Sequence, residues 1–247
     1  MCKGWSDEAL HSLREAIYHM GLQALSPEQE ERFAIYASFL HDYNEKVNLT
    51  AITDPRETAI KHFADSLSIE RLRVFSAQTK IIDVGSGAGF PGVPLLIRQP
   101  MLQVTLLDAS EKRVEFLRQL LEVLNLKANA VHIRSEDAAR QPNLRQSFDA
   151  VTMRAVASLN VSLEYALPFL KIGGAFYAQR GREAAAELPK AENALKILGG
   201  KVKRTDLFSL KDNRTTYGDR SLMEIVKERA TQQCYPRKPK DIRERPL

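Results

Sequence analysis

The sequence of 247 residues lacks several features that mark particular classes of protein. It has only two cysteines, Cys2 and Cys234, which are too few for a disulfide framework and lack the spacing of a metal site. No apolar run approaches the length needed to cross a membrane, and the first residues lack the apolar core of a signal peptide. There is no internal repeat or low-complexity tract. These absences favour a cytoplasmic protein without a membrane contact.

The composition is that of a folded, globular protein. Hydrophobic residues make up 44% of the chain and charged residues 27%, which argues against a disordered chain. The 36 Lys and Arg residues exceed the 31 Asp and Glu residues, giving a net charge of +5. This excess suits a nucleic-acid partner without requiring one. No helix is predicted to be apolar all round, so we expect a monomer.

Two kinds of periodicity divide the chain. Residues 6–75 repeat apolar side chains at helical spacing, so residues 1–75 are predicted to form an N-terminal helical extension. From residue 80 onward, short apolar runs alternate with helical stretches. The predicted strands are 80–85, 103–108, 129–134, 148–154, 174–180, 202–209 and 221–228. The predicted helices between the earlier strands are 91–98, 111–125, 158–170 and 183–198.

This alternation predicts an α/β fold of the Rossmann-like kind, with a seven-stranded, mostly parallel sheet covered on both faces. Only a short loop separates the last two strands, so one of them is expected to be antiparallel. We assign residues 76–230 to this domain and residues 231–247 to a basic C-terminal tail.

A glycine-rich turn follows the first predicted strand. Residues 87–92 fit the G-x-G-x-x-G pattern of dinucleotide-binding proteins. The turn also fits the D-x-G-x-G-x-G pattern of S-adenosylmethionine (AdoMet) enzymes, through Asp83, Gly85, Gly87 and Gly89. The Asp83 carboxylate at the strand end would repel a pyrophosphate but suits the cationic groups of AdoMet. Pro91 also removes one amide from an anion cradle. We therefore predict an AdoMet site.

Acidic residues follow the next two strands. Asp108 ends the second strand, where a carboxylate can bind the hydroxyl groups of a ribose. Glu136 and Asp137 follow the third strand, at the place where the adenine ring would lie. The alternative is a solvated acidic turn that caps the next helix.

Two absences after the fourth strand restrict the chemistry. Enzymes that methylate exocyclic amines of bases usually carry an Asn/Asp-Pro-Pro-aromatic tetrapeptide here, whereas residues 153–156 read Met-Arg-Ala-Val. Methylation of a pyrimidine C5 needs a cysteine nucleophile, and neither Cys2 nor Cys234 is suitably placed. The acceptor is therefore expected to present a lone pair, as guanine N7 does, and to need no general base. Arg154 is suited to contact the guanine O6, the methionine carboxylate or an RNA phosphate, or simply to form a salt bridge.

Residues ahead of the cofactor strand are candidates for contact with RNA. His62 and Asp65 lie three residues apart on one predicted helix face, a spacing more typical of a polar contact than of a catalytic dyad. Asn48 belongs to an Asn-Leu-Thr segment that breaks the helical periodicity. Both regions can fold over the substrate opening, so Asn48 and His62 are predicted to contact the substrate.

The C-terminal tail is basic. Arg237, Lys238 and Lys240 suit a polyanion such as RNA, and the prolines around them predict an extended arm without a helix. A solvated basic terminus without a partner is an equal alternative.

Together these motifs resemble the ribosomal RNA small subunit methyltransferase G family, also called glucose-inhibited division protein B. The resemblance covers nearly the whole chain and is carried by residues 48–50, 62–67, 83–94, 107–113, 154–157, 235–238 and 246–247. It implies an AdoMet-dependent enzyme that methylates N7 of one guanosine in bacterial 16S ribosomal RNA, either free or in the small ribosomal subunit. An NAD-type oxidoreductase and a non-catalytic RNA-binding module are the alternatives.

The resemblance also implies specific cofactor contacts. These fall on Gly85, Phe90, Asp108, Ala109, Ser110, Glu136, Asp137 and Arg154. Ala109 stands where many members carry serine, a change that a backbone contact would tolerate. Residues 240–245 differ from the usual Gly/Pro-rich tail of the family.

Overall fold

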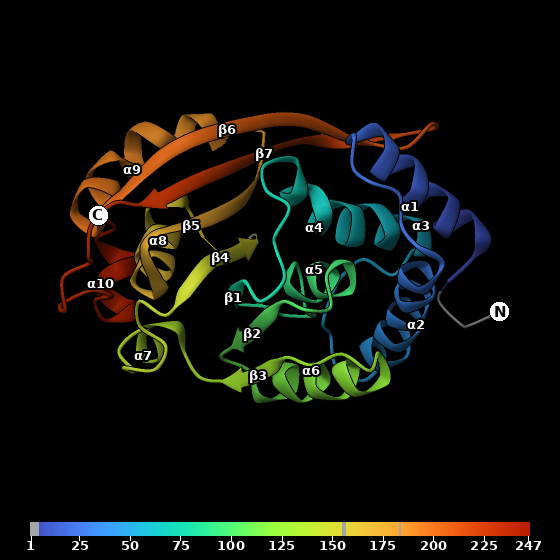
Figure 1. The fold of residues 1–247 in the computed structure, drawn as a ribbon, viewed down its shortest axis with the longest axis horizontal. Helices are drawn as coiled ribbons and strands as arrows, with labels where there is room; N and C mark the ends of the chain where they lie inside the picture. The colour runs from blue at the N-terminus through green and yellow to red at the C-terminus, as the bar shows by residue number, and fades with distance from the viewer. Residues whose placement is uncertain (1–4, 155–156, 183) are drawn as a thin grey trace.

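Seven strands form one sheet in the order β3-β2-β1-β4-β5-β7-β6 (Figure 1). The computed structural model describes residues 5–154, 157–182 and 184–247. The strands are β1 (Lys80–Val84), β2 (Gln103–Asp108), β3 (Asn129–His132), β4 (Phe148–Arg154), β5 (Leu170–Gly181), β6 (Gly200–Lys211) and β7 (Thr216–Lys227). Each overlaps a predicted strand, so the predicted Rossmann-like sheet is confirmed.

The pairing of the strands defines the edge at which a ligand can bind. β1 pairs in parallel with β2 and β4, β2 with β3, and β4 with β5. β7 is antiparallel to both β5 and β6, which confirms the expected antiparallel strand. The strand order reverses between β1 and β4, and sheets of this kind bind ligands outside the carboxyl ends of the strands at that reversal. The residues that follow β1, β2, β3 and β4 therefore meet at one edge.

Helices cover both faces because successive strand residues point to opposite sides of the sheet. Ile81 belongs to a core that includes residues of α1 (Asp7–His19), α2 (Pro27–Asn44), α5 (Gly92–Arg98) and α6 (Glu111–Val123). Ile82 belongs to a second core with α8 (Leu159–Ala166), the 3₁₀ turn η3 (Leu167–Phe169) and α9 (Ala184–Leu198). The N-terminal helices thus pack directly on the sheet. The division into domains at residues 75 and 230 stays a prediction.

Side-chain caps start the first two N-terminal helices. The Ser6 hydroxyl accepts a hydrogen bond from the Ala9 N–H at 3.1 Å, and Ser26 forms a capping box with Gln29. The third helical segment, capped by Asp54, changes its winding along its length. It consists of α3 (Pro55–Glu57), a π-helix η1 (Thr58–Ala64), α4 (Asp65–Leu67) and a 3₁₀ turn η2 (Ser68–Arg71). Apolar periodicity does not predict the π-helix, a geometry that recurs at functional sites.

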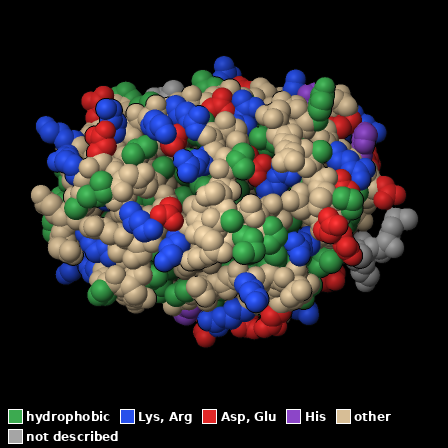
Figure 2. Space-filling view, in the orientation of Figure 1, with side chains coloured by type: hydrophobic (Ala, Val, Ile, Leu, Met, Phe, Trp, Pro, Cys, Tyr) green, Lys and Arg blue, Asp and Glu red, His purple; other side chains and the backbone are tan. Residues whose placement is uncertain are grey.

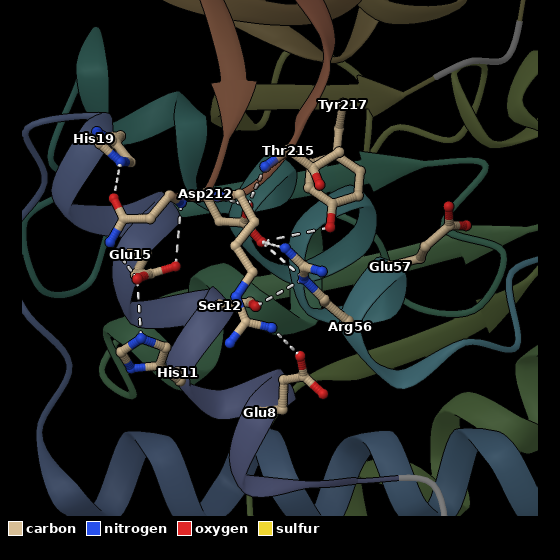
Figure 3. Close-up of polar contacts among 12 residues, drawn as sticks. Glu8, His11, Ser12, Glu15, His19, Arg56, Glu57, Asp212, Thr215 and Tyr217 are labelled. Carbon is tan, nitrogen blue, oxygen red and sulfur yellow. Dashed lines mark hydrogen bonds and ion pairs between the residues drawn. The ribbon is translucent and has the colours of Figure 1, made fainter.

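The hairpin of β6 and β7 reaches across to the N-terminal helices, where polar contacts hold its tip (Figure 3). Arg56 donates from Nε and Nη2 to Asp212 Oδ2 at 2.9 and 2.7 Å, and Nε also donates to the Ser12 hydroxyl of α1 at 3.1 Å. Asp212 Oδ1 accepts from the backbone N–H groups of Arg214 and Thr215 at 2.9 and 2.8 Å. These contacts fasten the first helices to the last two strands, although about 150 residues separate them in the sequence.

The C-terminal tail contains a short helix, so the predicted extended arm is wrong. Helix α10 (Pro239–Glu244) has Pro239 in its first turn, where proline loses no helical hydrogen bond and its fixed φ suits a helix. Ile242 is fully buried, and α10 packs against α8 (Figure 1). Prolines in a tail therefore do not exclude a helix when one of them stands at its start.

Candidate active site

The glycine-rich turn joins β1 to α5 at the reversal of the strand order. Gly85, Gly87 and Gly89 have φ angles of +73°, +58° and +98°, in the region that glycine occupies without strain. The N–H groups of Gly85 and Ser86 donate to the Leu107 carbonyl at 2.8 and 3.0 Å, so the turn rests on the end of β2. The three glycines predicted for the cofactor thus form one turn whose backbone carries no Cβ at those positions.

Asp83 lies beneath this turn and is fully buried. Its Oδ1 accepts from the Thr152 hydroxyl of β4 at 2.9 Å, and its Oδ2 accepts from the Gly92 N–H of α5 at 3.1 Å. Burial raises the pKa of Asp83 to about 6, although the hydrogen bonds from Thr152 and Gly92 oppose that rise. The carboxylate therefore holds β1, β4 and α5 together under the turn. Its predicted attraction to a cationic cofactor stays a prediction.

Asp108 organises the outer side of the turn. Its Oδ2 accepts from the Gly87 N–H at 2.9 Å, and its Oδ1 accepts from the Ser110 N–H at 2.9 Å. A carboxylate oxygen can accept more than one hydrogen bond, so these contacts leave capacity for a ribose hydroxyl. Ala109 is exposed and Ser110 is half-buried. Asp108, the residue predicted to bind the ribose, thus lies directly beside the glycines, and its contact with a ribose stays a prediction.

Glu136 and Asp137 belong to a short helix, α7 (Ser135–Ala138), that follows β3. Glu136 is only 4% exposed, whereas Asp137 is exposed. Among the described residues, no donor forms a hydrogen bond with Glu136 Oε1, and Arg134 Nη1 lies 3.7 Å from it. A buried carboxylate oxygen without a donor is costly, so this atom suits a ligand that brings an N–H group. The exocyclic amine of adenine is such a group, and the residues present therefore fit AdoMet.

Tyr36 supports the turn from the N-terminal helix α2, a role that no sequence pattern indicates. The Tyr36 side chain is fully buried, and its hydroxyl donates to the Ala88 carbonyl at 2.5 Å. Its ring stacks on Phe90 with a centroid distance of 5.4 Å. On a helix with an apolar face, a tyrosine is indistinguishable from a core residue by pattern alone. The contact shows that the N-terminal helices help to shape the cofactor turn.

Replacing Tyr36 with phenylalanine is expected to weaken AdoMet binding by about tenfold, because the Ala88 carbonyl loses its donor inside the protein. Titration calorimetry measures the effect. Tyr43, on the same helix, packs against Phe39 and Phe116 and provides the matched Tyr→Phe control. Equal AdoMet affinities for the two variants would show that the hydroxyl does not support the turn.

Arg154 ends β4 and is enclosed by residues of η1 and the turn. Its Nη1 donates to the Lys61 carbonyl at 2.9 Å and lies 3.4 Å from Asp65 Oδ2, so it forms an ion pair at the strand end. Its guanidinium lies over the Phe90 ring, 4.8 Å from the centroid. A contact of Arg154 with guanine or the cofactor stays a prediction. Ala155 and Val156, which follow it in the family motif, lie outside the described residues.

His62 is fixed in one tautomer by its neighbours. Arg154 Nη2 lies 3.2 Å from His62 Nδ1, and His62 Nε2 lies 2.8 Å from the Thr50 hydroxyl. Because a guanidinium can only donate, Nδ1 accepts and Nε2 carries the proton that is donated to Thr50. Burial, and then the charge of Arg154, lower the pKa of His62 to about 3. The ring is therefore neutral, stacked 4.4 Å from Phe90, and both of its nitrogens are occupied.

Asn48 and His62, both predicted to contact RNA, differ in exposure, although Thr50 of the Asn48 segment lies 2.8 Å from His62 Nε2. Asn48 is exposed and lines a hollow of about 270 Å³ between α2 and the segment that follows it. His62 is only 8% exposed and both of its nitrogens are engaged, so it orders the site; its contact with RNA stays a prediction. Lys and Arg side chains are mixed with Asp and Glu over the face in Figure 2.

The tail residues differ among themselves. Lys238 and Lys240 are exposed and stay candidates for RNA contact. The Arg237 guanidinium is paired with the buried Glu164 carboxylate at 2.7 Å. Its predicted contact with RNA stays a prediction.

Comparison with known proteins identifies the family. The family model described as rRNA small subunit methyltransferase G matches residues 29–217. The chain belongs to this family. A ribosomal RNA small subunit methyltransferase G from Desulfitobacterium hafniense is 44% identical over 224 residues, which cover 90% of this chain and 91% of the relative. One from Clostridium botulinum is 42% identical over 234 residues, covering 94% and 96% of the two chains.

Solved structures agree on the fold. The [4+2]-cyclase SpnF matches with a TM-score of 0.53 at 15% identity, covering 67% of this chain and 81% of that chain. The precorrin-6y C5,15-methyltransferase from Geobacter metallireducens matches with a TM-score of 0.50 at 15% identity, covering 72% and 90%. These matches support the fold alone, since their sequences are too different to carry function.

The glycine pattern fits both dinucleotide cofactors and AdoMet, and family membership decides between them. The chain is an AdoMet-dependent methyltransferase of small-subunit ribosomal RNA, and the dinucleotide alternative is wrong. Within the described ranges, no cluster of His, Cys, Asp and Glu is arranged to hold a metal ion. In the same ranges, no helix is both long and apolar enough to span a membrane.

Proposed function

We propose that this methyltransferase modifies N7 of one guanosine in 16S ribosomal RNA, by direct attack of the N7 lone pair and without a covalent intermediate. The observation that carries the proposal is the state of His62. Its Nδ1 accepts a hydrogen bond from the Arg154 guanidinium, and its Nε2–H donates one to the Thr50 hydroxyl. Neither nitrogen is therefore free to act as a base toward a substrate. Guanine N7 needs none, because its lone pair is free at neutral pH.

The reaction balances without a proton transfer. When bound, AdoMet supplies a methyl group activated by its sulfonium. The N7 lone pair forms the new N–C bond while the C–S bond breaks and its electron pair returns to sulfur. The protein then has only to position the guanine against the methyl group and to exclude water, and these two effects can supply much of the rate acceleration. Arg154 is held by Lys61 and His62 at the mouth of the turn, so it is preorganised to orient either the guanine or the cofactor.

The proposal predicts the loss of one modification. In a strain that lacks this protein, mass mapping of 16S RNA is expected to lose a single N7-methylguanosine, and the restored gene should return it. Recombinant enzyme with labelled AdoMet and unmodified small subunits should then add one methyl group per RNA.

Other results would exclude the proposal in distinct ways. An unchanged modification map would contradict the assigned reaction. A methyl group found on an exocyclic amine or on a pyrimidine C5 would contradict the acceptor atom only. A protein that binds the subunit but not AdoMet would be the non-catalytic RNA-binding module.

A further inference from the structure

The C-terminal segment lies beside the helix that carries the buried Glu136. The N–H of Ile133, just after β3, donates to the Asp108 carbonyl at 3.2 Å, so the start of α7 adjoins the predicted ribose site. In Figure 1 α10 lies close to α7 and α8, near the C-terminus. The adenine end of the cofactor site and the tail are therefore neighbours.

Arg140 joins Glu136 to the tail directly. Its Nη1 donates to the Glu136 backbone carbonyl at 3.0 Å, and its Nη2 donates to the Pro236 carbonyl at 2.5 Å. One planar guanidinium therefore fixes the distance between α7 and the tail. A shift of the tail would be passed to the backbone of Glu136.

The tail itself is anchored by a buried ion pair. Arg237 donates from Nε to Glu164 Oε1 at 2.9 Å and from Nη2 to Oε2 at 2.7 Å, and its backbone N–H also donates to Oε1 at 2.7 Å. The Glu164 side chain is 1% exposed, so these bonds are protected from water. They fix the tail on α8.

A third arginine, Arg145, binds the backbone at the start of the tail. Arg145 is buried and donates from Nη1 to the carbonyls of Ala139 and Tyr235, at 3.0 and 2.9 Å. Its Nη2 donates to the carbonyls of Thr231 and Gln232, at 2.9 and 3.0 Å. A segment held by this many hydrogen bonds is expected to stay ordered, unlike a mobile arm that binds RNA.

We propose that the C-terminal segment is the outer support of the adenine subsite, and that Arg237 is a positioning residue. Through Glu164 and Arg140, it holds Glu136 so that the free Oε1 receives the 6-amino group of the cofactor. The inference rests on the proposed function, in that the ligand is AdoMet or its product S-adenosylhomocysteine. It explains why a buried carboxylate oxygen lacks a protein donor in the described structure.

The test uses a ligand that differs only at the group in question. The analogue of S-adenosylhomocysteine with an unsubstituted purine base carries hydrogen in place of the 6-amino group, so it gives Glu136 no donor. Calorimetry on the full-length wild-type chain is expected to show a preference for S-adenosylhomocysteine of about tenfold to a hundredfold. Arg237→Gln should reduce the preference to about threefold, mainly through weaker binding of the adenine ligand. A general loss of stability would weaken both ligands alike.

Two further variants keep the test decisive. Arg245→Gln is the matched control, because this arginine pairs with Asp241 at the surface and is 78% exposed; it should keep the full preference. The double variant Glu164→Gln with Arg237→Gln leaves no buried charge unpaired, so it should fold while still losing the preference.

The failures are distinguishable. A wild-type protein that binds neither S-adenosylhomocysteine nor AdoMet would refute the proposed function and the inference with it. A wild-type protein that binds both nucleoside ligands equally would refute the role of Glu136. If Arg237→Gln and the double variant keep the preference and lose only affinity for ribosomal RNA, the tail is an RNA contact and the inference is wrong.

Discussion

Replacing Gly89 with alanine is expected to abolish detectable AdoMet binding and to lower the free energy of unfolding by about 3 kcal/mol or more. The new Cβ would lie 2.6 Å from the Tyr36 hydroxyl, 2.9 Å from Val93 Cγ2 and 3.2 Å from Leu117 Cδ2. Gly89 also has a φ of +98°, which a side chain adopts only with strain. Because Tyr36 would have to move, its hydrogen bond to Ala88 would be lost as well.

The matched control lies two residues earlier in the same turn. Gly87 has a φ of +58°, but a Cβ there would meet nothing closer than the Gly85 carbonyl at 3.9 Å. Gly87→Ala should therefore show the backbone strain alone, about 1–2 kcal/mol. Denaturant unfolding gives both values. In a Tyr36→Phe background the worst clash of Gly89→Ala is removed, so the two substitutions should cost less together than the sum of each alone. Equal costs at Gly87 and Gly89 would show that the packing is not responsible.

The strands and the cofactor turn were predictable because local chemistry determines them. Buried parallel strands require short apolar runs, and the turn at residues 85–89 requires glycine where φ is positive. The seven strands therefore appear where the pattern placed them. The glycine turn was also specific enough to indicate a nucleotide-like cofactor before any comparison.

Contacts between distant segments were not predictable in the same way. The hydrogen bond from Tyr36 to Ala88 spans 52 residues, and the contact of Arg154 with His62 spans 92. No local pattern distinguishes a tyrosine or histidine with such a partner from one without it. The tail was misjudged for the same reason, because the partner of Arg237 is Glu164, 73 residues away.

Acid is expected to act on His62 and Asp83 in opposite directions. His62 has a pKa of about 3 when folded against an ordinary 6.5, so between these values the unfolded chain binds more protons. The stability from the neutral His62 is thus complete above about pH 6.5 and is lost as the pH falls toward 3. Asp83 has a folded pKa of about 6 against an ordinary 3.8, so the folded chain binds more protons there and gains stability as the pH falls.

The variant His62→Gln should therefore reverse the order of stability on acidification. Glutamine can accept from Arg154 and donate to Thr50 but does not titrate, so at pH 7 it is expected to cost about 1–2 kcal/mol through lost stacking on Phe90. As the pH falls to 4, the free energy of unfolding of the wild type falls by as much as about 3 kcal/mol, because His62 binds a proton in the unfolded chain and not in the folded one. The variant has no titrating group at position 62 and loses no stability in this way, so it should become the more stable protein.

Denaturant unfolding at pH 7, 6, 5 and 4 measures this difference, and the other carboxylates cancel because both proteins share them. Asp83 is one of these shared carboxylates, so its gain in stability at lower pH appears equally in both proteins, and the difference between them reports on His62. A difference between the two proteins that stays constant over this range would mean that His62 is free to take up a proton in the folded state. His62 would then not be held in one neutral tautomer, and it could serve as a general base.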